Sequence, residues 1–462
     1  MTLTSCTVGP NYEPPRLEFV SFRYGSENLE KRERAAPPLD RWWEGFSDPV
    51  LVAIVQRVLD QNFELATAFA RVQEARAVAA ESDAQRLPTV AFDTSTTFEH
   101  QSLDGKLGTI ANGLPTFYRD QRDYRMGLVA SWEIDLFGGI QRGAAATQDE
   151  AQAAEADQAG SRVIVAADAA DAYFQICGFR GRLAIAESQI QTDERLLKLV
   201  RDRFKAGAAQ AREVAQAEAL LQQARATVPS LHIALDRQLN RLDVLMGVQP
   251  GTYSREIAIS RDIPSVPAIP RKAQPTEILR RRPDVIAAER RLAATSERIG
   301  AAISDYYPKV FLPGVLGLDS VSGARLFTPG ALGALGAGAL RWRLFDFGKV
   351  DAEVAKARGT NAVALANYRQ TMLRAIEDVE NSLSVFIQTQ HDSAELKAEV
   401  KALTKARDLS EQAYRAGSIT LTDVLDADRQ LLSARDHLSA SRADVARAAV
   451  GVFRSFGGGW TP

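Results

Sequence analysis

The sequence predicts a mixed fold in which long α-helices are combined with transmembrane β-strands, arranged as two structural repeats in one chain. Three observations lead to this prediction. The 462-residue chain contains two copies of one sequence pattern. Its longest segments carry a seven-residue apolar period that is typical of paired helices. Short segments of about ten residues alternate between apolar and polar side chains, as membrane strands do.

The internal repeat is visible at several separate places in the chain. Trp132 and Trp342, each followed five residues later by Phe-Gly, are 210 residues apart, and the stretch FKAG at 204–207 matches YRAG at 414–417 at the same separation. Upstream, Pro88 and Pro308 are 220 residues apart. We therefore expect repeat 1 over 49–248 and repeat 2 over 276–462, with an N-terminal segment over 1–48 and a proline-rich linker over 249–275.

Each repeat opens with a helix and continues with two strands. Residues 49–86 and 276–306 are rich in Ala, Arg and Glu with helical apolar spacing, and each segment ends near a proline. Strands are predicted at about 89–99, 124–136, 309–319 and 332–345.

The predicted strands have one apolar and one polar face. The residues expected to face lipid are Phe92, Leu128, Trp132, Leu312 and Trp342, and those expected to face a lumen are Asp93, Ser95, Glu99, Arg125, Glu133, Arg341 and Arg343. A water-soluble sandwich with one wet face has the same alternation. The strand count favours the barrel, because four strands cannot close alone and their edges must pair with other chains.

Each repeat ends with a long helical hairpin, predicted over 138–246 and 348–452. The returning halves keep an exact period of seven, with apolar residues at Val214, Leu221, Val228, Leu235 and Leu242 in repeat 1 and at Val424, Leu431, Leu438, Val445 and Val452 in repeat 2. Gly207 and Gly417 lie where the hairpins should turn, so the tips are predicted at 207–212 and 417–422.

Several function classes lack their residues. With 56 Lys and Arg against 58 Asp and Glu, the formal charge of −2 argues against a nucleic-acid partner. Two cysteines, four scattered histidines and the absence of HExxH, Cys-x-x-Cys and P-loop motifs predict no catalytic, cofactor-binding or metal site. The carboxylates Asp423, Asp426 and Asp428 are interpreted as a solvated helix face rather than an enzyme site. No stretch is long and apolar enough for a membrane helix.

Five motifs together resemble TolC-like outer-membrane efflux factors, in particular the lipoprotein (NodT-type) branch that serves resistance-nodulation-division pumps. They are CTVGPNYEPP at 6–15, WWEGFSDP at 42–49, RPDV at 282–285, YRAG at 414–417 and GGGW at 457–460. The resemblance implies a homotrimer whose twelve-stranded outer-membrane β-barrel, four strands from each chain, continues as a long periplasmic α-helical barrel. It also implies that 1–48 forms an N-terminal anchor and equatorial segment.

The function implied by this resemblance is a passive exit duct in the outer membrane. The implied partners are outer-membrane lipid, a periplasmic adaptor (membrane fusion) protein and an inner-membrane resistance-nodulation-division transporter, and drugs or other small compounds would be exported. Alternatives are a channel of the type I secretion class and, from a different class, a soluble coiled-coil scaffold with a minor sheet.

Two cysteines receive different interpretations. Leu3-Thr4-Ser5-Cys6 resembles a lipobox, which would make Cys6 the acylated first residue of the mature protein. No signal peptide is visible in the five residues before Cys6, so either the start is internal to a longer precursor, which we favour, or Cys6 has no such role. Cys177 is expected to be a small buried packing residue.

Two sites are expected at the hairpin tips. The resemblance places adaptor docking around Lys205, Gly207, Arg415, Gly417 and Ser418. It places a periplasmic gate at Thr422, Asp423, Asp426 and Arg429, where a carboxylate followed three residues later by an arginine holds the entrance in related channels. The alternative for Asp426 and Arg429 is an ordinary surface pair on one helix, worth about 0.2–0.5 kcal/mol in general.

Overall fold

The computed structural model describes residues 7–15, 20–23, 36–111, 118–253, 263–269 and 275–461. The chain folds into two compact units. Unit 1 consists of Met1–Pro15, Gln73–Ala153 and Glu289–Asn367, and unit 2 consists of Arg16–Val72, Ala154–Ala288 and Tyr368–Pro462. Unit 1 contains the sheet, and unit 2 contains the hairpin tips and the largest apolar core.

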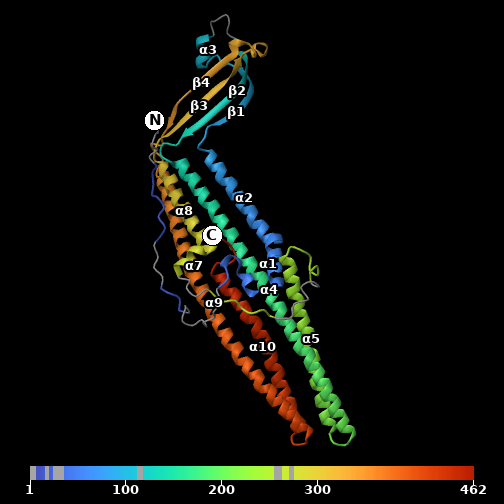
Figure 1. Ribbon diagram of the computed structural model, residues 1–462. Helices are drawn as coiled ribbons and strands as arrows, with labels where there is room; N and C mark the ends of the chain where they lie inside the picture. The colour runs from blue at the N-terminus through green and yellow to red at the C-terminus, as the bar shows by residue number, and fades with distance from the viewer. Residues whose placement is uncertain are drawn as a thin grey trace. The chain divides into compact units, whose positions relative to one another are not determined.

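Helices account for most of the chain (Figure 1). In repeat 1 they are the 3-10 helix η1 (Leu39–Phe46) and the α-helices α1 (Pro49–Gln61), α2 (Phe63–Ala84), α3 (Lys106–Ala111), α4 (Gly139–Lys205) and α5 (Ala211–Leu245). In repeat 2 they are α7 (Pro275–Arg281), α8 (Pro283–Ser304), α9 (Lys349–Arg415) and α10 (Leu421–Ser455), with the 3-10 turns η2 (Gly323–Arg325) and η3 (Pro329–Ala331). Across the described ranges, no helix combines the length and the apolar character needed to span a membrane.

The first helix of each repeat is divided in two, where the sequence predicts one helix. In repeat 1, Asn62 leaves the helical conformation and its side-chain oxygen accepts hydrogen bonds from the backbone N–H groups of Glu64 and Leu65, which caps the start of α2. In repeat 2, the break falls at Arg282 just before Pro283, because proline has no N–H and is best placed in the first turn of a new helix.

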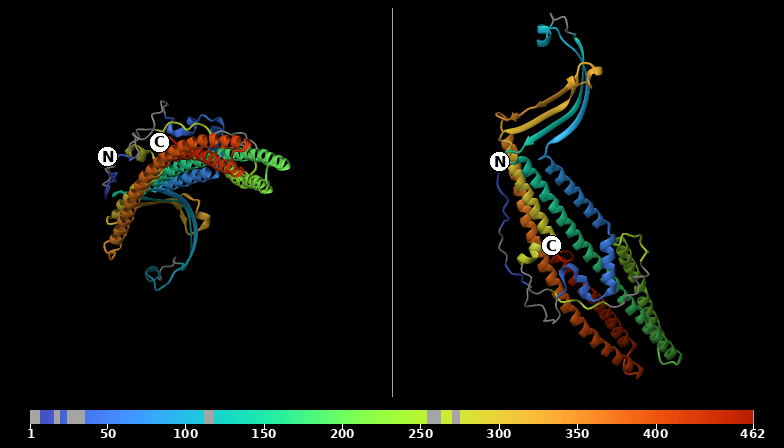
Figure 2. Two further views of the ribbon diagram at one scale, coloured as in Figure 1. Left: turned by 90° about the horizontal axis from the view of Figure 1, so that it is seen from below. Right: turned by 45° about the horizontal axis from the view of Figure 1, so that its top comes forward.

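The sheet of unit 1 is antiparallel and curved (Figure 2). Its strands are β1 (Thr89–His100), β2 (Asp120–Ile134), β3 (Lys309–Ser320), β4 (Leu332–Gly336) and β5 (Ala339–Arg341). The order is β1-β2-β3-β4, with β5 also paired to β3.

The last strand is interrupted, although the sequence predicts a single strand over 332–345. The backbone N–H of Ala337 donates to the carbonyl oxygen of Pro313 at 3.0 Å. Pro313 has no N–H with which to return the bond, so the ladder breaks between β4 and β5. The register is unchanged across this break, since Gly314 pairs with Gly336 and Phe311 with Ala339.

The two repeats build the sheet in the same way. Thr89 pairs with Ser131, and the equivalent residues of repeat 2, Lys309 and Arg341, pair with each other. The indole N–H of Trp132 donates to the carbonyl oxygen of Arg86 at 2.9 Å, and that of Trp342 donates to Tyr306 at 3.0 Å. Each tryptophan therefore satisfies a carbonyl just beyond the end of the helix that precedes its strands.

The core of unit 2 combines aromatic and alanine side chains. Trp42 stacks on Phe453 with ring centroids 5.4 Å apart, and Phe46 packs on Phe174 at 4.9 Å. The hydroxyl of Tyr173 donates to Asp48 at 2.5 Å. Cys177 is fully buried in this core, which confirms the packing role expected for it.

Candidate functional site

The site residues predicted from the sequence lie on the strands, at the ends of the strands and at the hairpin tips. Among the described residues, no three His, Cys, Asp or Glu side chains are grouped so as to hold a metal ion.

The strand register of unit 1 sorts the predicted side chains onto two faces. Phe92 pairs with Leu128 and Trp132 with Leu312, so these four apolar residues share one face. Ser95 pairs with Arg125, which in turn pairs with Asp319, on the opposite face. There Arg125 contacts Asp123 at 2.7 Å and Asp319 at 3.6 Å.

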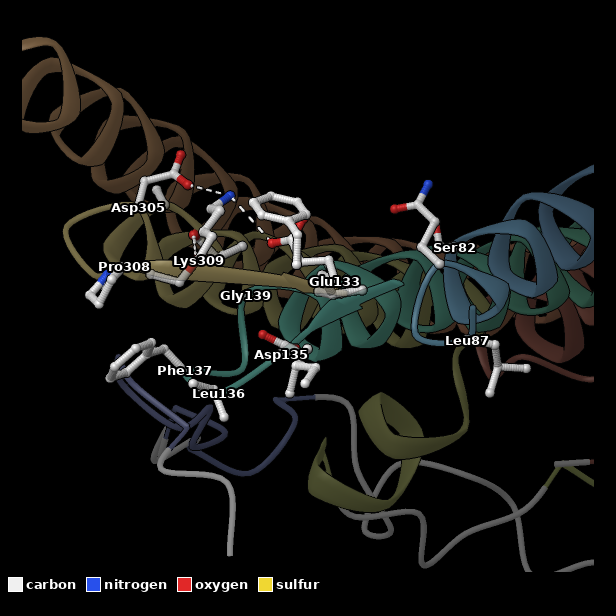
Figure 3. Close-up of a pocket in the computed structure, with 18 of the residues that line it drawn as sticks. Ser82, Leu87, Glu133, Asp135, Leu136, Phe137, Gly139, Asp305, Pro308 and Lys309 are labelled. Atoms are coloured by element: carbon white, nitrogen blue, oxygen red, sulfur yellow. Dashed lines mark hydrogen bonds and ion pairs between the residues drawn. The ribbon is translucent and has the colours of Figure 1, made fainter. Parts of the chain in front are cut away.

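A charged pocket of about 860 Å³ lies at the foot of the strands, between β2, β3, α4 and α8 (Figure 3). The ammonium group of Lys309 lies 2.8 Å from Asp305 and 3.9 Å from Glu133. The guanidinium of Arg343 lies 3.8 Å from Asp305 and 3.6 Å from Glu353. Glu133 and Arg343, both expected to face the lumen, therefore belong to one ionic network.

The first described residues are attached to this same end of unit 1. The backbone N–H of Val8 donates to the carbonyl oxygen of Phe137 at 3.1 Å. The guanidinium of Arg142, which is almost fully buried, donates to Asn11 at 2.9 Å and to Glu297 at 2.8 Å. Gly9 lies so close to Gly300 that a side chain at position 9 would collide with the backbone of Gly300. A side chain at position 300 would instead crowd the side chain of Arg142 and the carbonyl oxygen of Val8. Cys6 lies outside the described residues.

The two hairpin tips of unit 2 have the same geometry. Gly207 and Gly417 have positive φ angles of 72° and 76°, and the next residue donates back to Arg203 or Ala413. All five predicted docking residues (Lys205, Gly207, Arg415, Gly417, Ser418) are exposed.

A charged groove accompanies the first tip. It has a volume of about 800 Å³ and is lined by α4 and α5, with Lys205 at its margin. Arg201 pairs with Glu218 at 2.6 Å and Arg225 with Glu194 at 2.7 Å across the two helices.

The predicted gate residues share an exposed surface at the start of α10. Thr422, Asp426 and Arg429 follow one another at helical spacing, and Arg429 contacts Asp426 at 3.5 Å with both side chains more than half exposed. Within one chain this is the geometry of an ordinary surface pair. Asp423 lies beside them and accepts hydrogen bonds from the backbone and hydroxyl of Thr420, which hold the pKa of its carboxyl below the usual range.

Asp428 is not part of a solvated face, so that prediction is wrong for this residue. Its side chain is 2% exposed and accepts a 2.9 Å hydrogen bond from Arg407. Asp193 on α4 is 1% exposed and was not identified from the sequence. The seven-residue period contained the signal: Asp428 lies four residues after Val424 and three before Leu431, and Asp193 lies between Ile190 and Leu197, so both occupy core positions of the helical pairing.

Comparison with known proteins gives one consistent result. The chain matches the family described as "Outer membrane efflux protein" over residues 54–248 and 275–458. It is 31% identical to the pyoverdine export outer membrane protein OpmQ of Pseudomonas aeruginosa, covering 92% of this chain and 88% of OpmQ. It is 28% identical to nodulation protein T of Rhizobium leguminosarum bv. trifolii, covering 97% and 92% of the two chains. The solved structure of the outer-membrane channel OprN superposes with a TM-score of 0.91 at 32% identity, covering 99% of this chain and 100% of that one.

Proposed function

Since this chain belongs to the outer membrane efflux protein family, we propose which of its parts carry out the steps of efflux. The protein is an outer-membrane exit duct of a tripartite efflux pump, and three copies form the channel, which extends into the periplasm. It is a passive transport structure and not an enzyme. The main support for this function is that the family match covers both repeats. Each repeat joins a pair of two-faced strands to a helical hairpin.

The pump it serves belongs to the resistance-nodulation-division class, and its cargo consists of small compounds. The likeness to nodulation protein T and to the solvent and toluene efflux proteins of Pseudomonas putida supports this choice over a type I secretion channel. The chain itself contributes a gate at the narrow entrance, where three-fold symmetry would convert Asp426 and Arg429 into rings of three charges.

A periplasmic adaptor docks at the hairpin tips. The groove between α4 and α5 presents both signs of charge, and helical hairpins of a partner extend a pair of helices where their ends are exposed. Lys205 and Arg415 occupy equivalent exposed positions at the two tips, so each offers a cation to the adaptor.

Cys6 carries the lipid anchor. Thr7, its neighbour in the chain, lies against Gly138 just after β2, and Val8 is hydrogen-bonded to Phe137. Thr7 is bonded directly to Cys6 in the chain, so its contact near the end of β2, a strand with a proposed lipid face, supports an acyl anchor at Cys6.

A charge-reversal experiment tests the docking proposal. In a strain that lacks its own duct, Lys205→Glu and Arg415→Glu together should abolish resistance to pump substrates while the trimer is still made in normal amount. Lys397→Glu is the matched control, because Lys397 is an exposed cation on α9 about 27 Å along the helix from Arg415. Full resistance in the double variant would contradict adaptor docking at the tips. If the protein gave the strain no resistance to any small compound but allowed it to secrete a protein, the channel would belong to the type I secretion class.

A further inference from the structure

One aromatic side chain at the foot of the sheet is fully exposed in a single chain. Phe347 lies between β5 and α9, and its relative exposure is 103%, so its ring packs against nothing in the described part of the chain. It ends a run of exposed apolar residues that includes Trp342, Leu344 and Phe345. A continuous apolar surface of this kind marks a place where another molecule is bound.

The backbone turn at Phe347 points to the same conclusion. Its φ angle of 55° lies in the left-handed region, which costs free energy for a bulky side chain. The carboxylate of Asp346 holds the turn by accepting hydrogen bonds from the backbone N–H groups of Gly348 at 3.1 Å and Val350 at 3.0 Å. The turn therefore presents the ring in advance, so little freedom is lost when a partner covers it.

The equivalent aromatic residue of repeat 1 is covered. Phe137 lies 210 residues before Phe347 and also precedes a glycine with a positive φ angle. Its ring stacks on Tyr307, with ring centroids 4.5 Å apart and planes inclined by 20°. Phe137 follows β2 and Tyr307 precedes β3, the partner of β2 in the sheet. The stacked rings thus extend the contact between the two repeats beyond their last strand pair.

The equivalent of Tyr307 in repeat 1 is Leu87, which is also uncovered. Leu87 lies 220 residues before Tyr307, directly ahead of Pro88 and β1, and it is 65% exposed. Figure 3 shows Leu87 well away from Phe137, although both residues line the same pocket. Since β1 and β5 lie on opposite sides of the central strands β2 and β3, Leu87 and Phe347 belong to opposite edges of the sheet.

We propose that Phe347 of each copy packs on Leu87 of the next copy and so repeats between chains the contact of Phe137 with Tyr307. The contact closes each boundary between copies at the level where the strands end and the helices begin. This inference rests on the proposed function, because it requires several copies in one channel. It adds to that function an anchor that lies outside the strand pairing.

The strand positions above Phe347 match in the same way. Inside the chain Trp132 pairs with Leu312, and the repeat equivalents Trp342 and Phe92 are both more than half exposed. The same shift that brings Phe347 to Leu87 brings Trp342 opposite Phe92 of the next copy. Cross-strand pairs of aromatic and apolar residues stabilise a sheet. The contact of Phe347 therefore continues a row of apolar contacts between two copies.

Alanine variants of the full-length trimer test the role of the ring. Phe347→Ala should raise the rate at which trimers release monomers in warm detergent by about tenfold or more, because it removes a buried aromatic anchor. Phe345→Ala is the matched control, since Phe345 is 90% exposed and lies two residues away. Its repeat equivalent is Asp135, whose carboxylate accepts a hydrogen bond from the backbone of Gln141. Trimers of the control should dissociate at the rate of the parent.

A double-mutant cycle tests whether Leu87 is the partner. Leu87→Ala should also speed dissociation, and the double variant should dissociate no faster than Phe347→Ala, because both changes remove the same contact. Phe347→Glu combined with Leu87→Lys should restore stability that each charged variant lacks alone. This rescue keeps the test decisive if an alanine variant folds poorly.

Three results would contradict the inference. If Phe347→Ala has no effect on the trimer, or if its effect and that of Leu87→Ala multiply, the contact is rejected while the duct stands. If Phe347→Ala weakens binding to phospholipid vesicles and leaves dissociation unchanged, the ring enters the membrane surface instead. If the parent chain forms no trimer in lipid, both the contact and the proposed duct of three copies are rejected.

Discussion

At the residue scale, neighbouring carboxylates on α10 have different roles because they lie on different faces of the helix. Asp423 closes the first turn with Thr420, Asp426 faces solvent beside Arg429, and Asp428 points into the hairpin contact. Asp423 and the buried Asp193 of α4 respond to pH in opposite directions. The carboxylate of Asp423 stabilises the first turn of α10, and this stabilisation is lost only when the pH falls through the lowered pKa of Asp423. The carboxyl of Asp193, in contrast, loses its proton as the pH rises through about 6.

Removing the gate charges should open the entrance. In Asp426→Ala with Arg429→Ala, three copies of each charge disappear from the narrowest part of the bore, so single-channel conductance in planar bilayers should rise and cells should become sensitive to large antibiotics. If conductance matches the parent, Asp426 and Arg429 are only a surface pair within each chain.

The cap of α10 gives a separate prediction. Thr420→Ala removes the hydroxyl that contacts Asp423 at 2.7 Å and should destabilise the start of α10 by about 0.5–2 kcal/mol. Faster hydrogen exchange in the first turn of α10 would measure this loss. Thr420→Ser keeps the hydroxyl and should exchange like the parent; an equal increase in both variants would show that the cap does not hold the turn.

At the element scale, periodicity predicts which segments are helices and strands but not where tertiary contacts interrupt them. The seven-residue period and the dyad alternation are properties of the local sequence, and the mixed fold class they predict is confirmed. The division of the first helices depends on the side chain of Asn62 and on Pro283, and the break between β4 and β5 depends on Pro313 in the neighbouring strand. The seven-residue period places Asp193 and Asp428 at core positions, but it does not reveal that Arg407 on α9 is the partner of Asp428.

The two faces of the sheet should respond differently to a charge. Leu128→Arg places a cation on the apolar face and should cost about 2–4 kcal/mol if that position lies near the middle of the bilayer. Ser95→Arg places the same side chain on the polar face next to Arg125 and should be tolerated far better. Unfolding of the folded trimer in lipid bilayers compares them, and equal destabilisation would contradict the assignment of the faces.

At the scale of the whole molecule, the repeat predicts how one chain meets the next. Inside unit 1, β2 of repeat 1 pairs with β3 of repeat 2, and Ser131 lies opposite Pro313. The equivalent of Ser131 in repeat 2 is Arg341, and the equivalent of Pro313 in repeat 1 is Asp93. If the duct repeats its internal pairing between chains, Arg341 lies opposite Asp93 of the neighbouring copy, and the two residues have opposite charges.

The open edges of the sheet agree with this arrangement. In the described part of the chain, β1 pairs only with β2, and β4 and β5 pair only with β3, so the outer edge of each is available to another chain. An exposed edge of this kind is stable in a membrane only when it is paired. Three copies joined in the same register would close the sheet without a free edge.

The central claim, that three copies close one duct by repeating the internal strand pairing, is tested most directly by disulfide cross-linking. Directly opposed strand residues have Cβ atoms about 4.5–5.5 Å apart, near the range that a disulfide bridges. Asp93→Cys combined with Arg341→Cys, in a Cys177→Ala background, should give covalent trimers on a non-reducing gel, whereas either cysteine alone should not. Asp93→Cys with Arg343→Cys, displaced by two residues on the same face, should cross-link far less. Monomers only, or equal cross-linking of the displaced pair, would contradict the account.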